Sequence, residues 1–183
     1  IAFFDRHKTL DPNHEYLALC FDVCHQAVMF EDCYASLERL NQARVPVGKI
    51  QLSNAMICHL PTHDEPRRAQ VLDTLSQFAE ATYLHQVKAL DAQGRRVAWP
   101  DLPAALAACA GFSELRIHFH IPLFSEHLLL PELSGSQTAL AQTFDYLASH
   151  WAFRPVLEVE TYSWGVLPTA LRPGTEHAQL QGI

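Results

Sequence analysis

The chain has 183 residues, 49% of them hydrophobic and 18% charged, a composition that indicates a folded domain rather than a disordered or fibrous chain. Thirteen Lys and Arg against 20 Asp and Glu give a formal net charge of −7, which argues against a nucleic-acid partner because such a protein needs a basic face. The apolar stretches are broken before the roughly 18 residues that a membrane-spanning helix needs, so we expect no membrane span and a small-molecule ligand.

The cysteine and histidine contents bear on compartment and chemistry. Five cysteines form an odd set without regular spacing, and with no leader-like N-terminus they predict reduced, buried and inert thiols in a cytoplasmic protein. Eleven histidines direct attention to metal or proton chemistry. The chain begins at Ile1 in a segment that reads as the end of a helix, which predicts a piece of a longer protein.

Blocks typical of strands alternate along the chain with blocks typical of helices. A nearly continuous apolar run at residues 16–22 predicts a parallel strand buried on both faces. Three further core strands are predicted at residues 49–57, 114–121 and 154–162. Apolar residues at helical spacing predict helices at residues 29–43, from Pro66 onward, at 102–109 and at 137–150. The turn-rich sequence Asp91–Gly94 predicts a hairpin-like excursion between residues 82–90 and 96–99.

This order of elements bears on the fold class. Strands that alternate with helices predict right-handed βαβ units and a parallel sheet. Four such strands are half of a (β/α)8 barrel, which typically takes about 250 residues. A small open doubly wound sheet is the alternative.

Three polar clusters fall at the C-terminal ends of predicted strands, where parallel α/β folds bind their ligands. The clusters are Asp22–His25, Arg116–His120 and Glu158–Trp164. Strand alternation places the charged members of the last two clusters on one face and branched apolar residues on the other. Carboxylates and imidazoles from three strands are ligands for a divalent metal such as Zn, Mn or Mg. The expected ligands are Asp22, His25, His120 and Glu160, with His118 and Glu158 as alternatives for the last two.

Each cluster also has a structural interpretation. Asp22 could cap a loop beside His25, the two histidines of the second cluster could bond the backbone, and the two glutamates of the third could neutralise Arg116. Buried unpaired acids are costly, so three coincident clusters favour the functional interpretation. The sequence has no GxGxxG, P-loop, GxSxG or HExxH motif, which argues against nucleotide binding and serine hydrolysis.

The same residues resemble a known superfamily. Asp22-x-x-His25 at a strand end, a later His-bearing strand and a Glu on the last strand are similar to the xylose-isomerase-like (AP endonuclease 2) TIM barrels of sugar isomerases and epimerases. The phrases CFDVCHQAVMFED, GKIQLSNA, YLHQVKAL, RIHFHIPLF and LEVETYSWGVLP resemble the EboE family of that superfamily, named for metabolite traffic. The resemblance spans nearly the whole chain. It implies that residues 1–171 are the C-terminal half of a (β/α)8 TIM barrel, with parallel strands alternating with helices, that 172–183 are a polar tail, and that the N-terminal half of the barrel is missing.

The resemblance also implies roles for individual residues. The superfamily holds a divalent metal through Glu, Asp, His and Glu side chains from successive strands. Asp22 matches its Asp, His25 the neighbouring His that binds metal or substrate, and Glu160 or Glu158 its final Glu, whereas its first Glu would lie upstream of Ile1. The strand expected to supply the metal His has Gln51 instead, and His118 or His120 would have to compensate.

Two functional hypotheses follow. The first is a metal-dependent isomerase, epimerase or related lyase acting on a small polyhydroxylated or phosphorylated metabolite, in which Glu160 or Glu158 moves a proton beside an oxygen polarised by the metal. Its substrate-binding residues would be Arg116, His118, Gln51 and Trp164. The second is a non-catalytic metabolite-binding or traffic protein with a degenerate metal site. Phosphodiester hydrolysis on DNA is disfavoured by the acidic charge.

Overall fold

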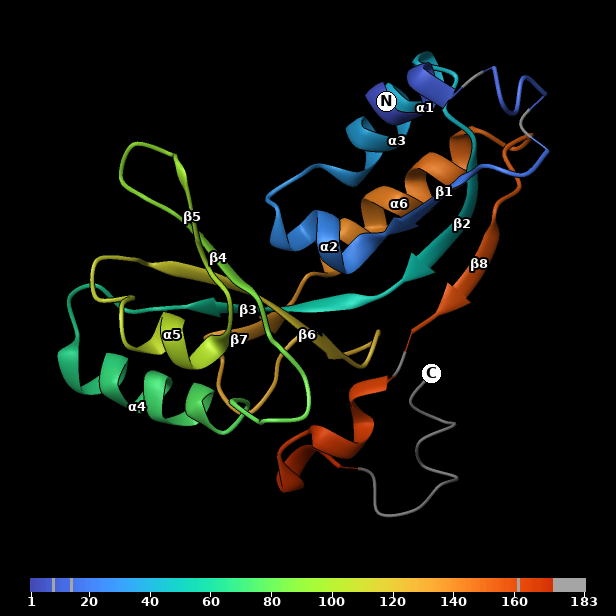
Figure 1. The fold of residues 1–183 in the computed structure, drawn as a ribbon. Coiled ribbons are helices and arrows are strands. Elements are labelled where there is room, and N and C mark those ends of the chain that lie inside the picture. Colours follow the sequence, from blue (N-terminus) through green and yellow to red (C-terminus); the bar gives the residue numbers. More distant parts are fainter. Residues whose placement is uncertain (8, 14, 161, 173–183) are drawn as a thin grey trace.

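The computed structural model describes residues 1–7, 9–13, 15–160 and 162–172, which are organised around two β-sheets (Figure 1). In this part of the chain the first sheet is parallel and has three strands in the order β1–β2–β8. The strands are β1 (Leu19–Asp22), β2 (Val47–Leu52) and β8 (Val156–Val159). Because they run in one direction, their C-terminal ends lie at one edge, where Asp22 is in register with Gln51, and Gln51 with Glu158.

The second sheet is antiparallel and has five described strands in the order β5–β4–β6–β3–β7. They are β3 (Asn54–His59), β4 (Val87–Leu90), β5 (Arg96–Trp99), β6 (Glu114–Ile121) and β7 (Leu133–Gly135). A single residue, Ser53, separates β2 from β3. The chain therefore passes from one sheet directly into the other at the C-terminal end of β2 (Figure 1).

Six α-helices and two 3-10 helices occur in the described residues. They are α1 (Ala2–His7), α2 (Val23–Val28), α3 (Cys33–Gln42), α4 (Glu65–Ser76), α5 (Leu102–Leu106), α6 (Gln137–Ser149), η1 (Tyr162–Val166) and η2 (Thr169–Leu171). Four α-helices begin directly after an aspartate whose side chain accepts a hydrogen bond from a backbone N–H of the first turn, as good N-caps do. These aspartates are Asp22, Asp32, Asp64 and Asp101.

Both sheets pack against helices, and one helix, α2, contacts both sheets. Helices α2, α3 and α6 cover the parallel sheet (Figure 1) around a core that includes Phe21 and Ile50. Helices α4 and α5 accompany the antiparallel sheet, where the buried rings of Phe78 and Phe119 meet edge to face at 5.3 Å between centroids. Helix α2 packs against β2 and also against β3 and β6, so it lies over the junction of the two sheets.

The predicted half of a TIM barrel is wrong, because the fold is mixed α/β with a separate antiparallel sheet. The predicted third parallel strand, at residues 114–121, is β6, which runs antiparallel to both β3 and β4. The predicted strand at 49–57 is two strands, divided at Ser53 between the two sheets. Residues 114–121 alternate polar and apolar, which is typical of antiparallel strands buried on one face, whereas parallel strands are apolar on both faces.

Several local predictions are confirmed. Strand β6 has the predicted bounds, and the hairpin of β4 and β5 turns at residues 91–94, where Gly94 has a φ of +74° that favours glycine. Helix α4 has Pro66 in its first turn, as expected for proline. The helix predicted at 29–43 begins later, at Cys33, because Asp32 caps it there.

Three further predictions have separate outcomes. The five cysteines are free thiols, and four are buried, but Cys20 is exposed. Among the described residues, no helix has the length and apolar character needed to cross a membrane. Of the polar tail predicted at 172–183, all but Arg172 lies outside the described residues.

Candidate metal centre

Carboxylates, imidazoles and one thiol gather where the two sheets meet. The residues are Asp22 at the end of β1, Cys24 and His25 in α2, His118 and His120 in β6, and Glu160 directly after β8. They come together because α2 starts at the C-terminal end of β1 and packs against β6. Each of the two sheets thus supplies part of the cluster, and α2 connects them.

Asp22 is oriented by the backbone and by the junction between the sheets. Its Oδ1 accepts hydrogen bonds from Ser53 Oγ at 2.7 Å and from the backbone N–H of His25 at 3.3 Å. The Ser53 hydroxyl accepts in turn from the backbone N–H of Cys24 at 2.9 Å. Asp22 Oδ2 lies 3.9 Å from Nε2 of His25. One carboxylate oxygen therefore fixes the start of α2, and the other faces an imidazole.

Three imidazoles lie against one another. Nε2 of His118 and Nε2 of His120 are 3.3 Å apart, and the two ring planes are nearly perpendicular, at 88°. The ring of His25 stacks on His118 with centroids 4.2 Å apart and planes at 26°. The side chain of His25 is 52% exposed, whereas that of His120 is 2% exposed. The three rings thus lead from the surface into the interior.

Burial changes the protonation of the two inner rings. It lowers the pKa of His118 from its usual 6.5 to about 4, with a further contribution from neighbouring His25. Burial likewise lowers the pKa of His120 to about 4. Both rings are therefore uncharged at neutral pH, and an uncharged imidazole has a nitrogen lone pair that can bind a metal ion.

Glu160 approaches the other nitrogen of His120. Its Oε2 lies 3.7 Å from His120 Nδ1 and accepts a hydrogen bond from Gln51 Nε2 at 3.1 Å. Burial, and next the charge of Asp22, raise the pKa of Glu160 above its usual value. The Ser163 hydroxyl of η1 donates a hydrogen bond to the backbone carbonyl of His120, which holds the segment after Glu160 against β6.

In the described residues, three overlapping sets have donor atoms within 4.8 Å of one another: Asp22–His120–Glu160, Asp22–His25–His118 and Cys24–His118–His120. Two ligand atoms of a tetrahedral zinc site, each about 2.1 Å from the ion, are about 3.4 Å apart. The measured separations of 3.3, 3.7 and 3.9 Å lie close to that value. The residues present therefore fit a divalent metal ion.

All four expected ligands, Asp22, His25, His120 and Glu160, fall within these sets, and His118 joins them. Of the expected substrate-binding residues, Gln51 contacts the cluster through Glu160.

Two other candidates lie away from the cluster, and a third is not described. Glu158 forms a salt bridge with Lys49 and is 48% exposed. The Arg116 guanidinium lies over the ring of Phe30 at 3.9 Å and donates a hydrogen bond to the carbonyl of Ala27 at 2.8 Å. Ala27 is in the last turn of α2 and Phe30 follows that helix, so Arg116 contacts the end of α2 that is remote from Asp22. The side chain of Trp164 lies outside what the structure describes.

The sequence reasoning missed Cys24 and Ser53. Cys24 is fully buried, and burial, with the charges of Asp22 and Glu160, raises the pKa of its thiol well above the usual value. The sequence predicts Cys24 to be an inert core thiol, because it has no CxxC pair and the other cysteines are distant. Its position two residues after Asp22 was the available signal. Nothing in the sequence marked Ser53 as the residue that orients Asp22.

Comparison with known protein families, with curated proteins and with solved structures gives no match for this chain. Membership of the EboE family therefore stays a prediction. The inference of a metal centre depends on the geometry of the residues alone.

Proposed function

We propose that this protein is a divalent-metal-dependent enzyme of the isomerase or epimerase type, acting on a small polyhydroxylated or phosphorylated metabolite. The main support is the convergence of Asp22, His120 and Glu160, whose donor atoms lie within 4.8 Å of one another. Three protein ligands with mixed nitrogen and oxygen donors are typical of catalytic metal sites, which keep a position open for substrate. Asp22 and Glu160 also lie at the C-terminal ends of parallel strands, where α/β folds bind their ligands.

The residues of this set have complementary roles in the proposal. A divalent ion bound there would polarise a carbonyl or hydroxyl oxygen of the substrate. Asp22 and His120 would hold the ion together with Oε2 of Glu160, which faces His120 Nδ1. We assign the second oxygen, Oε1, to take a proton from the adjacent carbon and return it, and the raised pKa of Glu160 suits such a group. The exposed ring of His25 would orient a substrate hydroxyl.

A non-catalytic metabolite-binding protein is the second candidate. It is favoured by the side-chain contacts of Glu160 and Glu158, because each of the two carboxylates already has a polar partner. Gln51 bonds Glu160 at 3.1 Å, and Lys49 pairs with Glu158. These contacts hold both carboxylates in fixed positions, which suits a binding site better than a base that has to reach the substrate.

The test compares Asp22→Asn with Asp32→Asn. Both aspartates cap a helix through their side chains, and asparagine keeps the cap, but only Asp22 belongs to the metal-binding sets. We expect Asp22→Asn to weaken Mn²⁺ binding, measured by calorimetry, by about 100-fold or more, because loss of even an outer-shell contact costs 10- to 100-fold. Asp32→Asn should bind as the unaltered chain does.

Catalysis is tested separately on the metal-loaded protein. Aldoses, ketoses and their phosphates are incubated in D₂O, and exchange of carbon-bound protons is followed by NMR. Exchange that is lost in Glu160→Gln would support the enzyme. Metal binding without exchange of any sugar would favour the binding protein, and a chain that binds no divalent ion would overturn the metal centre.

A further inference from the structure

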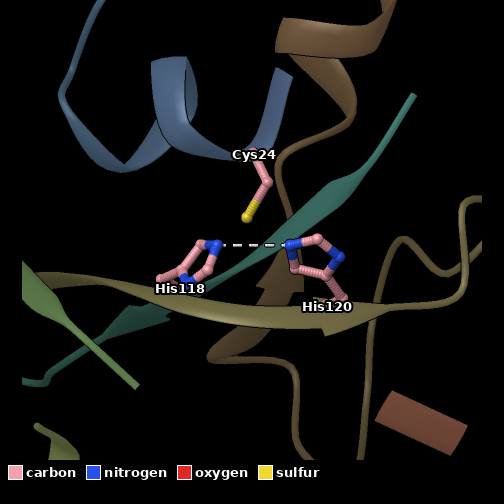
Figure 2. A group of neighbouring side chains, drawn as sticks. All are labelled: Cys24, His118 and His120. Atoms are coloured by element: carbon pink, nitrogen blue, oxygen red, sulfur yellow. Dashed lines mark hydrogen bonds between the residues drawn. The ribbon is translucent and has the colours of Figure 1, made fainter. Parts of the chain in front are cut away.

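The two ring nitrogens of His120 face different sets of donors. Nδ1 lies 3.7 Å from the Glu160 carboxylate, whereas Nε2 lies 3.3 Å from Nε2 of His118. The Cys24 sulfur lies on the Nε2 side of His120, and the donor atoms of Cys24, His118 and His120 all lie within 4.8 Å of one another. Figure 2 shows the sulfur next to the two facing nitrogens, above the line that joins them.

We propose that Cys24, His118 and His120 form a second, buried metal site, and that this site takes zinc. It is separate from the oxygen-rich set of Asp22, His120 and Glu160, which binds through the opposite nitrogen of His120. Sulfur and imidazole donors suit zinc, whereas magnesium and manganese prefer oxygen. Two histidines and one thiolate give three protein ligands, which leaves the fourth tetrahedral position for water or substrate.

The present geometry is close to that of a zinc complex. The 3.3 Å between the two Nε2 atoms is already the separation of about 3.4 Å that two imidazoles on a tetrahedral zinc ion adopt. Zinc–sulfur and zinc–nitrogen bonds of about 2.3 and 2.1 Å place sulfur and nitrogen about 3.6 Å apart. With donors at most 4.8 Å apart, each sulfur–nitrogen separation has to shorten by no more than about 1.2 Å.

The surroundings hold these donors in place. Cys24 is fully buried and His120 nearly so, in the layer between α2 and β6. The backbone of Cys24 is fixed by the hydrogen bond from its N–H to Ser53 Oγ. The backbone N–H of His118 donates to the carbonyl of Gln86 at 2.8 Å. An ion at this position therefore meets donors on rigid elements rather than on loops, which favours tight binding.

Binding changes the protonation of two groups. As the sulfur–zinc bond forms, the thiol proton of Cys24 leaves for solvent, because a coordinating thiol is deprotonated. The contact between the two Nε2 atoms requires one of them to carry a hydrogen in the absence of metal. That ring has to exchange its proton with solvent so that the proton lies on Nδ1 and both Nε2 atoms present lone pairs to the ion. Neutral His120 then carries its proton on Nδ1, so an ion at the oxygen-rich set can bind at the same time only if His120 also gives that proton to solvent.

The experiment uses Co²⁺ as a spectroscopic probe for zinc, with the full chain and a non-thiol reductant. We expect Co²⁺ to produce a near-ultraviolet sulfur-to-cobalt charge-transfer band, and excess Zn²⁺ to remove it. Cys24→Ser should abolish the band. The matched control is Cys33→Ser, since Cys33 is also fully buried, lies in the same core and follows a capping aspartate, but belongs to no described metal set. It should keep the band.

Two further variants separate this site from the proposed enzyme. Glu160→Gln should keep the charge-transfer band while it loses the oxygen-rich site. His118→Gln should abolish the band with Cys24 intact, and circular dichroism establishes that each variant is folded. Co²⁺ that binds without a sulfur band, or a band that survives in Cys24→Ser, would overturn the second site and leave the proposed enzyme standing. A chain that binds no Co²⁺ or Zn²⁺ would overturn both.

Discussion

The two faces of β6 differ in kind, although they belong to one strand. On one face Leu115, Ile117 and Phe119 are fully buried in an apolar core. On the other face His118 and His120 pack toward α2 with polar partners. The first face has a strong stabilising role, because buried apolar area is the main favourable contribution to folding. The second face places polar groups at low exposure, where they contribute less to stability but have strongly altered pKa values.

This difference predicts which substitutions change stability and which change metal binding. A residue of the apolar core should alter the free energy of unfolding and leave the affinity for metal in the folded protein unchanged. A residue of the polar face should alter the response to pH or to metal. Substitutions that mix the two effects would show that the faces are not independent.

The largest expected effect is that of Phe78→Ala in the apolar core. The ring of Phe78 is fully buried and meets Phe119 edge to face at 5.3 Å, so its removal leaves a cavity. We expect the free energy of unfolding, measured by urea denaturation, to fall by about 3–5 kcal/mol. Phe124→Ala is the control, because that side chain is 62% exposed and its loss should change stability by less than about 0.5 kcal/mol. Equal effects of the two variants would contradict the assigned core.

Local sequence patterns predict the elements of this fold better than their assembly. The bounds of β6 follow from the alternation at residues 114–121, and the start of α4 follows from Pro66 after a capping aspartate. The partner of a strand is not a local property. The strand-like segment at residues 49–57 continues across Ser53, and nothing in its pattern shows that the two halves pair with different strands.

The sequence predicts those members of the candidate site that lie at the ends of parallel strands. Asp22 and Glu160 lie where two parallel strands end, as the general rule for such sheets requires. The histidines of β6 were placed on the correct strand but in the wrong sheet, and they reach the cluster only because α2 packs on β6. The position of Cys24 two residues after Asp22 was the one local signal for a donor, but its neighbours His118 and His120 come from a strand far along the chain.

The polar face of β6 predicts a loss of stability at mildly acidic pH. Folding lowers the pKa of His118 and His120 from 6.5 to about 4, so the unfolded chain binds more protons than the folded chain between those values. Stability is therefore complete above pH 6.5 and falls as the pH decreases toward 4. For metal-free protein we expect the free energy of unfolding to drop between pH 7 and pH 5 by about 2 kcal/mol for each of the two rings.

The control for this prediction is the double variant His118→Gln, His120→Gln, measured by urea denaturation at the same two pH values with chelator present. It should lack most of the decrease, because its amides do not titrate. A decrease of the same size in the variant would assign the effect to other groups and contradict the lowered pKa values.

The smallest expected effect concerns Gln51, which connects the parallel sheet to the cluster without being a ligand. Its Nε2 donates to Glu160 Oε2 at 3.1 Å, and its Oε1 accepts from Cys20 Sγ at 3.2 Å. Gln51→Leu keeps a side chain of similar size but releases the carboxylate, so metal affinity at the oxygen-rich set should fall about tenfold, as for other outer-shell contacts. Calorimetry with Mn²⁺ measures this loss, because manganese prefers oxygen ligands.

Gln142→Leu is the matched control for Gln51→Leu. Gln142 also bonds two elements, through the backbone N–H of Cys33 and the carboxylate of Asp32, but Gln142 contacts no member of the cluster through these bonds. It should lose some stability and keep its manganese affinity. Because Gln51 touches only the Glu160 side of His120, Gln51→Leu should also leave the Co²⁺ band of Cys24 unchanged. A simultaneous loss of manganese affinity and of the cobalt band would mean that one ion shares both sets of donors, and that His120 does not separate two sites.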